Sequence, residues 1–246
     1  MDKIIMEDET IEDLQLGGLK LIQKQKSFRY GMDTILLAHF ADIKENETVA
    51  DLGTGNGILP LLLIGRNKGS LFYAIDVLPE AAQLARRNAE LNKLTDRIKV
   101  FQTDAKDAAV YINPCSVDAV VCNPPYGQPN ATLVSPNNAK AVARSQNIYT
   151  LNNIFSGAFK ILKGKGRFYM VYPVQQMLSV MKKLQDYHLE PKRFRLVYPS
   201  EMKKANLVLI EAVKDAKPAL HPLPPLMIFK SDGNLTNELK SVYHIL

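Results

Sequence analysis

The chain has 246 residues, of which 46% are hydrophobic and 23% charged, and its formal net charge is +6. These values are typical of a globular protein with one α/β domain, or with one domain and a small appendage. No apolar run approaches the roughly 20 residues that span a bilayer, and the segment MDKIIMEDETIEDLQLGG lacks the basic and apolar regions of a signal peptide. We therefore expect a cytoplasmic protein without a membrane-spanning segment.

Short β-rich runs alternate with longer helical runs along the chain, which predicts a parallel sheet with crossover helices. Helices are expected over Met32–Asp42 with Asp33 as a candidate N-cap, Ile58–Ile64, Glu80–Leu91 behind Pro79, Ile148–Leu162 and Val174–Tyr187. Seven strands are expected, over Val49–Leu52, Leu71–Ile75, Ile98–Gln102, Ala119–Cys122, Arg167–Tyr172, Phe194–Tyr198 and Leu207–Ala212. We expect a single domain over residues 1–246, with an N-terminal extension over about 1–45 and a C-terminal segment of unassigned structure over about 216–246.

The chain has two cysteines, Cys115 and Cys122. They form no CxxC pair, and no histidine lies at metal-ligand spacing from them. We expect reduced thiols with a mainly structural role, and no metal site.

A glycine-rich segment, Asp51-Leu-Gly-Thr-Gly-Asn-Gly57, follows the first predicted strand and precedes a helix. Gly53, Gly55 and Gly57 allow the backbone to turn tightly and to approach a ligand. The spacing is GxGxG, because Ile58 stands where the dinucleotide fingerprint has its third glycine, and no P-loop lysine follows. Since a structural turn also explains this loop, its interpretation depends on the residues that end the next strands.

Acidic residues end or follow the next two predicted strands. Asp76 can accept hydrogen bonds from both hydroxyls of a ribose, and Asp104 can accept one from an adenine amino group. Helix capping is the competing role of each acid. An adenosyl ligand accounts for both acids and for the glycine loop, since the carboxyl ends of neighbouring parallel strands share one crevice.

The fourth predicted strand runs into Asn123-Pro124-Pro125-Tyr126-Gly127, the most specific pattern in the chain. Proline fixes its own φ and restricts the residue before it to extended conformations, so the carbonyls of Asn123 and Pro124 have nearly fixed directions. The Asn123 side-chain oxygen and the Pro124 carbonyl thus form a rigid pair of acceptors beside the Tyr126 ring. A planar molecule that carries an NH2 group fits this arrangement.

The glycine loop Asp51–Gly57, the acids Asp76 and Asp104, and the segment Asn123–Tyr126 occur in the order found in class I amino-methyltransferases that depend on S-adenosylmethionine (AdoMet), and they resemble the motifs of that family. In this family, NPPY marks the branch that methylates amino groups. Upstream, Phe28–Ala38 (FRYGMDTILLA) is similar to the segment before the glycine loop in bacterial tRNA adenine-N6 methyltransferases that modify the anticodon loop of a valine tRNA. The similarities cover roughly residues 20–210. They imply the Rossmann-like α/β fold of class I methyltransferases, with a seven-stranded, mostly parallel sheet and helices on both faces.

The resemblance also implies roles for individual residues. Asn123 and Pro124 would hold both N–H bonds of an aromatic amine out of the ring plane and so direct its lone pair toward the methyl carbon, while Tyr126 stacks on the base. Phe28 and Asp33 are candidates for closing the site, beside core and capping roles. The expected AdoMet-binding residues are Asp51, Gly53, Gly55, Gly57, Asp76, Asp104 and Ala105, and the expected substrate contacts are Pro125, Lys203 and Lys204.

Charge is distributed unevenly along the chain. Residues 1–150 carry 16 Lys and Arg against 18 Asp and Glu, a balance of −2, whereas residues 151–246 carry 15 against 7, a balance of +8. Taken by itself, this uneven charge is explained by a solvated surface. Together with the family resemblance, the excess of positive charge favours tRNA as the partner, with its phosphates across the C-terminal half. The expected phosphate contacts are Lys163, Lys165, Lys192, Arg193, Arg195, Lys203 and Lys204.

Three alternatives remain open. Release-factor glutamine methyltransferases share NPPY but usually carry a helical N-terminal domain, for which about 45 residues before the first strand leave little room. Methyltransferases of ribosomal RNA guanine N2 more often have Phe where this chain has Tyr126. A non-catalytic RNA-binding module with the retained fold is the non-enzymatic alternative, against which the intact glycine loop and Asn123 argue. An NAD-dependent oxidoreductase is disfavoured by the glycine spacing and by NPPY.

A monomer is the favoured oligomeric state.

Overall fold

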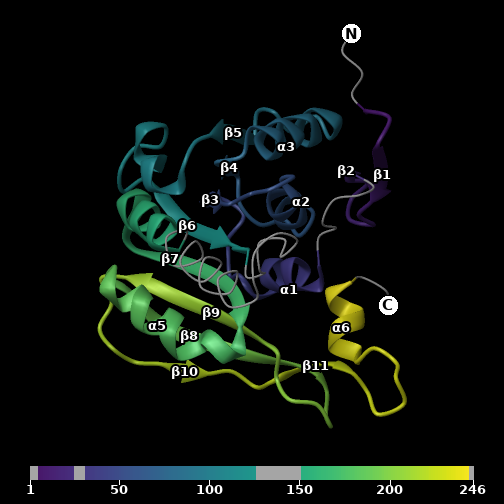
Figure 1. The fold of residues 1–246 in the computed structure, drawn as a ribbon, viewed down its shortest axis with the longest axis vertical. Coiled ribbons are helices and arrows are strands. Elements are labelled where there is room, and N and C mark those ends of the chain that lie inside the picture. The colour runs from purple at the N-terminus through teal and green to yellow at the C-terminus, as the bar shows by residue number, and fades with distance from the viewer. Residues whose placement is uncertain (1–4, 25–30, 126–150, 244–246) are drawn as a thin grey trace, which may run out of the picture.

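The computed structural model describes residues 5–24, 31–125 and 151–243. A nine-stranded sheet forms its centre, with the strand order β10-β8-β9-β7-β6-β3-β4-β5 and with β11 also paired to β8 (Figure 1). The strands are β3 (Thr48–Leu52), β4 (Leu71–Asp76), β5 (Ile98–Gln102), β6 (Val117–Cys122), β7 (Leu162–Pro173), β8 (Leu189–Ser200), β9 (Leu207–Lys214), β10 (His221–Pro222) and β11 (Leu226–Phe229).

The sheet is mostly parallel, as predicted. Strands β3, β4, β5, β6 and β7 pair in parallel, and β9 runs antiparallel between β7 and β8. All seven predicted strands are present, but the count of seven was too low. The proline-rich segment after residue 216 adds β10 and β11, two short strands on the side of β8 that faces away from β9. These two strands form because the edge of β8 is free to pair, and no local sequence pattern in this segment predicts that pairing.

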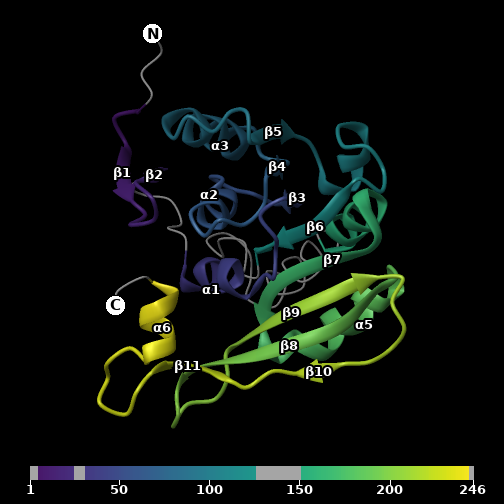
Figure 2. The same ribbon diagram turned by 180° about the vertical axis from the view of Figure 1, so that it is seen from behind.

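Helices cover both faces of the sheet, as predicted. On one face, α1 (Met32–Phe40), α2 (Ile58–Ile64) and α6 (Asn237–Val242) contribute to a cluster of buried residues that includes Val49, Val121 and Leu209. On the other face, residues 151–161, which are helical, and α5 (Met177–Asp186) bury Phe155 and Leu184 against the sheet. Figure 2 shows both layers from behind. Neighbouring residues of β3 and β6 fall into different clusters because successive side chains of a strand point to opposite faces.

The first helix departs from the prediction at both ends. Gly31 is the N-cap of α1, so Asp33 lies inside the first turn and is not the cap. Its Oδ1 accepts a hydrogen bond from the Thr34 amide at 2.9 Å. The helix ends at Phe40 instead of Asp42, where the ammonium group of Lys68 donates to the carbonyls of Ala38, His39 and Ala41. A distant lysine thus satisfies carbonyls that the helix end leaves unpaired.

A second, two-stranded sheet of β1 (Glu9–Asp13) and β2 (Lys20–Lys24) was not predicted. It lies against α3 (Pro79–Leu91), where the buried Asn88 amide pairs with the backbone of Ile22: its Oδ1 accepts from the amide at 2.6 Å, and its Nδ2 donates to the carbonyl at 3.2 Å. The remaining short elements are the 3-10 turns η1 (Ala105–Val110) and η2 (Val174–Gln176). Throughout the described ranges, no helix is long and apolar enough to cross a membrane.

Candidate active site

Four parallel strands carry the predicted site residues to one edge of the sheet. The glycine loop follows β3, Asp76 ends β4, Asp104 follows β5 and Asn123 follows β6. These strands are direct, parallel neighbours in the order β6-β3-β4-β5, so their carboxyl ends lie at the same edge of the sheet. This edge is where ligands bind in open α/β sheets.

The glycine loop has a backbone that only glycine adopts without strain. Gly53, Gly55 and Gly57 have φ of 83°, 57° and 81°. The amides of Gly53 and Thr54 both donate to the Ile75 carbonyl at 2.9 Å, which ties the loop to β4. A Cβ would meet nothing within 4 Å at Gly53 or Gly55, whereas at Gly57 it would lie 3.2 Å from the Cβ of Ala85. The first two glycines therefore border open space, and the third permits close packing on α3.

Asp51 lies beneath this loop and is completely buried. Its Oδ2 accepts a hydrogen bond from the Thr54 hydroxyl at 2.6 Å, while its Oδ1 has no hydrogen-bond partner in the described structure. Burial raises the pKa of this carboxyl to about 7; Asp76 acts in the same direction, and the Thr54 hydrogen bond opposes it. A buried carboxylate oxygen without a partner is unfavourable by itself and suits a site that receives a cationic group.

Asp76 connects the glycine loop to the start of α3. Its Oδ2 accepts from the Gly55 amide at 2.8 Å, and its Oδ1 accepts from the Leu78 amide at 2.9 Å. The N-cap of α3 is Leu78, so Asp76 does not have the alternative role of capping that helix. Each carboxylate oxygen keeps a further acceptor position for a ligand hydroxyl.

Asp104 caps a helix here, the role that competed with adenine binding. It is the N-cap of η1 and accepts from the Lys106 amide at 3.2 Å. Its Oδ2 also accepts from the Asn153 amide group at 2.8 Å. Ala105 begins η1, and its carbonyl lies so close to Gly157 that a Cβ there would be 1.9 Å from the oxygen. These contacts establish the capping role of Asp104 and do not test its predicted role in adenine binding.

The NPPY segment leaves the sheet beside the glycine loop. Asn123 is half-buried and its Nδ2 donates to the Thr34 hydroxyl of α1 at 2.8 Å. Pro124 is buried and Pro125 is exposed. Tyr126 and Phe28 lie outside the described residues.

The predicted phosphate contacts divide between the two edges of the sheet. Lys203 and Lys204 are exposed in the turn between β8 and β9, at the same edge as Asn123. Lys163 and Lys165 stand at the start of β7, at the opposite edge. The first pair remains a candidate for contacting a substrate at the site, whereas the second pair is misplaced for it.

The other three basic residues are engaged within the protein, as are Lys163, which pairs with Asp118, and Lys165, which donates to the Asp215 carbonyl. Arg195 forms a bidentate pair with Glu238 of α6, at 2.6 and 2.9 Å. Arg193 pairs with the Glu211 carboxylate, and Lys192 donates to the Lys217 carbonyl at 3.1 Å. These partners make the three residues weaker candidates for phosphate contacts, and charge balance along the sequence does not reveal such partners.

Sequence reasoning missed three residues that hold the site together: Thr34, Asn88 and Asn153. Asn88 Nδ2 donates to the Asn56 carbonyl at 2.9 Å and so secures the glycine loop. An asparagine at a buried position of an amphipathic helix was the available signal, since buried amides need partners. Nothing local marks Thr34 or Asn153, whose partners are distant in the sequence.

Both cysteines are free, Cys115 exposed and Cys122 buried in β6. Burial, with the nearby carboxylates of Asp51 and Asp76, raises the pKa of the Cys122 thiol well above its usual value. No cluster of three or more potential metal ligands occurs among the described residues. We assign the Cys122 thiol a packing role.

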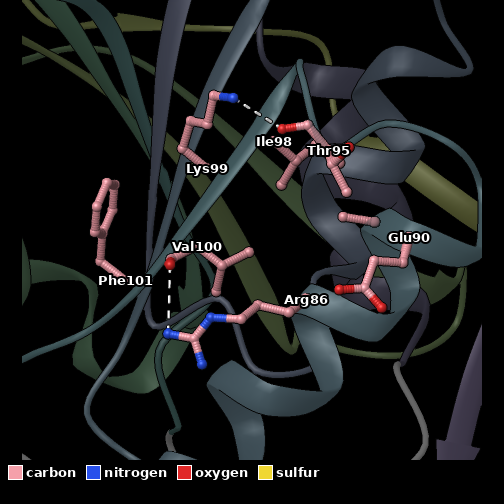
Figure 3. A pocket seen from close by; sticks show the side chains of 8 residues that line it. Arg86, Glu90, Thr95, Ile98, Lys99, Val100 and Phe101 are labelled. Carbon is pink, nitrogen blue, oxygen red and sulfur yellow. Dashed lines mark hydrogen bonds between the residues drawn. The ribbon is translucent and has the colours of Figure 1, made fainter. Parts of the chain in front are cut away.

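A groove of about 290 Å³ lies apart from the predicted residues, between α3 and the edge strand β5 (Figure 3). Arg86 donates to the Val100 carbonyl at 3.4 Å and Lys99 donates to the Thr95 carbonyl at 3.0 Å. Charged side chains of this kind cover a sheet edge that would otherwise be open to pairing. The groove contains none of the predicted site residues.

Comparison with known proteins supports the family assigned from the motifs. The profile of the family described as "Methyltransferase small domain" matches residues 30–190. The chain belongs to this methyltransferase family. The matched range includes the glycine loop, both acids and the NPPY segment, so these residues lie within the family's methyltransferase domain.

Relatives of this methyltransferase share most of its length. A protein of Flavobacteriaceae bacterium strain 3519-10, named tRNA1(Val) (adenine(37)-N6)-methyltransferase, is 29% identical over 72% of this chain and 80% of its own. A protein of Dyadobacter fermentans with the same name is 25% identical over 86% of each chain. The crystal structure of a predicted O-methyltransferase from Agrobacterium tumefaciens superimposes with a TM-score of 0.67, at 21% identity over 87% of this chain and 96% of that one. This last likeness confirms the predicted methyltransferase fold.

Proposed function

We propose that this methyltransferase transfers a methyl group from AdoMet to N6 of an adenine in a tRNA anticodon loop. The observation that carries the proposal is the position of the Asn123-Pro124 acceptors beside the glycine loop, because these two segments directly follow the adjacent strands β6 and β3. The names of the relatives, which specify adenine 37 of a valine tRNA, support this choice of substrate.

The residues at the sheet edge fit AdoMet. Open space borders Gly53 and Gly55, and the unpartnered Oδ1 of Asp51 lies beneath the loop. We propose that the loop backbone and Asp51 hold the methionine part of the cofactor, that Asp76 binds its ribose, and that Asp104 with Ala105 binds its adenine. When bound, AdoMet supplies a methyl group on a sulfonium, whose positive charge is lost on transfer.

The protein's own contribution is the orientation of the target amine. An aromatic amine is a weak nucleophile because its lone pair is delocalised into the ring. The Asn123 Oδ1 and the Pro124 carbonyl accept its two hydrogens and hold both N–H bonds out of the ring plane. The nitrogen then becomes pyramidal and its lone pair is directed toward the methyl carbon, while Tyr126 stacks on the base. Transfer breaks the bond between sulfur and methyl and leaves the nitrogen positively charged. The nitrogen then loses one hydrogen as a proton to solvent, so alignment of this kind needs no strong general base at the site.

An anticodon loop suits the site because its bases are single-stranded and leave the stack at low cost. The turn that carries Lys203 and Lys204 joins β8 and β9, which lie three and two strands from β6 along the sheet, about 10–14 Å at the usual strand spacing. That distance allows both lysines to contact phosphates that flank a base held at Asn123. We also propose that the enzyme acts as a monomer in the cytoplasm, where its substrate is found.

The test is incubation of the protein with methyl-labelled AdoMet and, separately, unmodified total tRNA, ribosomal RNA and release factors. We expect N6-methyladenosine in tRNA. If tRNA is not modified but a release factor acquires methylglutamine, or ribosomal RNA acquires N2-methylguanosine, the tRNA adenine is not the substrate and the modified molecule is. AdoMet binding without transfer to any of the three would favour the non-catalytic RNA-binding module.

Asn123→Ala separates the chemical role of this residue from cofactor binding. We expect turnover to fall by far more than AdoMet affinity, because the amide oxygen acts on the substrate amine and not on the cofactor. Single-turnover rates and calorimetric AdoMet binding measure the two effects. Equal losses in both would remove Asn123 from the reaction.

A further inference from the structure

We infer that Thr34, supported by Asp33, is a positioning residue that holds the Asn123 amide with its oxygen toward the methyl-accepting amine. The inference rests on the proposed function, in which that oxygen accepts a hydrogen from the amine. It concerns α1, a helix that lies outside the glycine-loop and NPPY motifs.

The contact that carries the inference joins residues 89 positions apart: the Asn123 Nδ2 donates to the Thr34 Oγ1 at 2.8 Å. Thr34 is 3% exposed, so water does not compete freely for its hydroxyl. A carboxamide has a donor end and an acceptor end of nearly equal shape, and only its partners distinguish the two orientations. With the NH2 end held by Thr34, the Oδ1 end points away from α1.

Asp33 favours this direction of the hydrogen bond. A carboxylate only accepts, and the Asp33 Oδ1 receives the Thr34 amide at 2.9 Å and the Thr34 hydroxyl in a longer contact of 3.5 Å. With its hydrogen directed to the carboxylate, the hydroxyl offers a lone pair to Asn123. The chain of donors therefore runs from Asn123 through Thr34 to Asp33. The reverse amide orientation would place the Asn123 oxygen against the lone pairs of the hydroxyl.

Gly31 leaves the room that Asp33 needs. A Cβ at Gly31 would lie 2.5 Å from the Asp33 Oδ1, closer than any real contact of that kind. The carboxylate thus folds back over the N-cap of α1, where the helix amides also favour a negative charge. The start of α1 is arranged to keep this acceptor beside Thr34.

The main test compares Thr34→Val, which removes the hydroxyl at nearly constant volume, with Thr34→Ser, which keeps it. We expect Thr34→Val to lower the single-turnover rate with unmodified total tRNA roughly ten- to hundredfold, the range for a misplaced catalytic group. Thr34→Ser should stay close to the wild-type rate. The affinity for AdoMet and the melting temperature should change little in either variant.

Thr48→Val is the matched control, because Thr48 begins β3 at the opposite edge of the sheet. It should retain the wild-type rate. Asp33→Ala leaves Thr34 in place but removes the acceptor that directs its hydroxyl, so the rate should fall here too, and Asp33→Asn should restore most of it. Equal rates for Thr34→Val and wild type, or equal losses in Thr34→Val and Thr34→Ser, would overturn the inference.

A second measurement is independent of the substrate. In 15N-labelled protein, the Asn123 side-chain NH2 signals, assigned by their absence in Asn123→Ala, should shift in Thr34→Val and remain in place in Thr34→Ser. Unshifted signals in Thr34→Val would contradict the positioning role even if no RNA is methylated. If instead Asn123→Ala retains full activity while the signals shift as expected, the proposed role of Asn123 fails and the contact itself stands.

Discussion

At the scale of single residues, we expect Asp51 to make AdoMet binding depend on pH. Its carboxyl is buried, its Oδ1 has no partner in the described structure, and its pKa is raised to about 7. The proposed cationic ligand binds the ionised form, so AdoMet affinity should rise as the pH rises through this pKa. Between pH 5.5 and pH 7.5 we expect an increase of roughly tenfold or more, the linkage of one proton.

Calorimetric titration at several pH values measures this dependence, and Asp51→Asn is the control that cannot ionise. The variant should bind AdoMet more weakly and with a flat pH profile. The sign for stability is opposite: since the folded pKa lies above the unfolded value, the ligand-free protein loses stability as the pH rises from about 4 to about 7. A pH-independent affinity in the wild-type protein would separate Asp51 from the cofactor.

At the scale of secondary structure elements, Gly157 sets how closely the helical residues 151–161 approach η1. A Cβ at this position would lie 1.9 Å from the Ala105 carbonyl oxygen, so Gly157→Ala forces the two elements apart. The gain in helix propensity is less than about 1 kcal/mol, and the overpacking costs about 1–3 kcal/mol. We expect a lower melting temperature and weaker AdoMet binding, because Asp104 and Ala105 move with η1.

Gly164→Ala is the matched control for this change. Its Cβ would meet nothing within 4 Å, and Gly164 lies in β7 at the opposite edge of the sheet. It should leave both the melting temperature and AdoMet affinity near wild-type values. A Gly157→Ala protein as stable as this control would mean that the two elements separate without cost.

At the scale of the whole molecule, the direction of each strand determines which lysines lie at the same sheet edge as the site. Lys203 and Lys204 stand at the edge with Asn123, and Lys163 and Lys165 stand at the other edge. Replacing the first pair with Ala should weaken tRNA binding. The plot of log affinity against log salt concentration should also become less steep, by the amount expected for the loss of up to about two phosphate contacts. The second pair, changed in the same way, removes the same charge and should have a much smaller effect.

Binding of unmodified tRNA at several salt concentrations distinguishes the two double variants, with AdoMet affinity as the check that both remain folded. Similar losses in both would indicate that net charge alone attracts the RNA. Loss of AdoMet affinity only in the Lys203→Ala, Lys204→Ala protein would indicate a structural role for that turn.

The sequence by itself determined the seven principal strands, the glycine loop and the acceptor segment. Each depends on short-range physics: alternating side chains define a strand, glycines permit positive φ at Gly53, Gly55 and Gly57, and prolines restrict Asn123 and Pro124. Because parallel neighbours end at one edge, strand order alone brings these local motifs together. The methyltransferase family could therefore be inferred before the fold was known.

Tertiary structure decided what depends on distant partners. Asp33 is not the N-cap of α1, the edge of β8 recruits β10 and β11, and Arg193 and Arg195 are occupied by carboxylates. The contact between Thr34 and Asn123 joins segments 89 residues apart. Tertiary packing determines which polar groups meet and therefore which hydrogen bonds and ion pairs form. A local pattern of residues does not predict these partners.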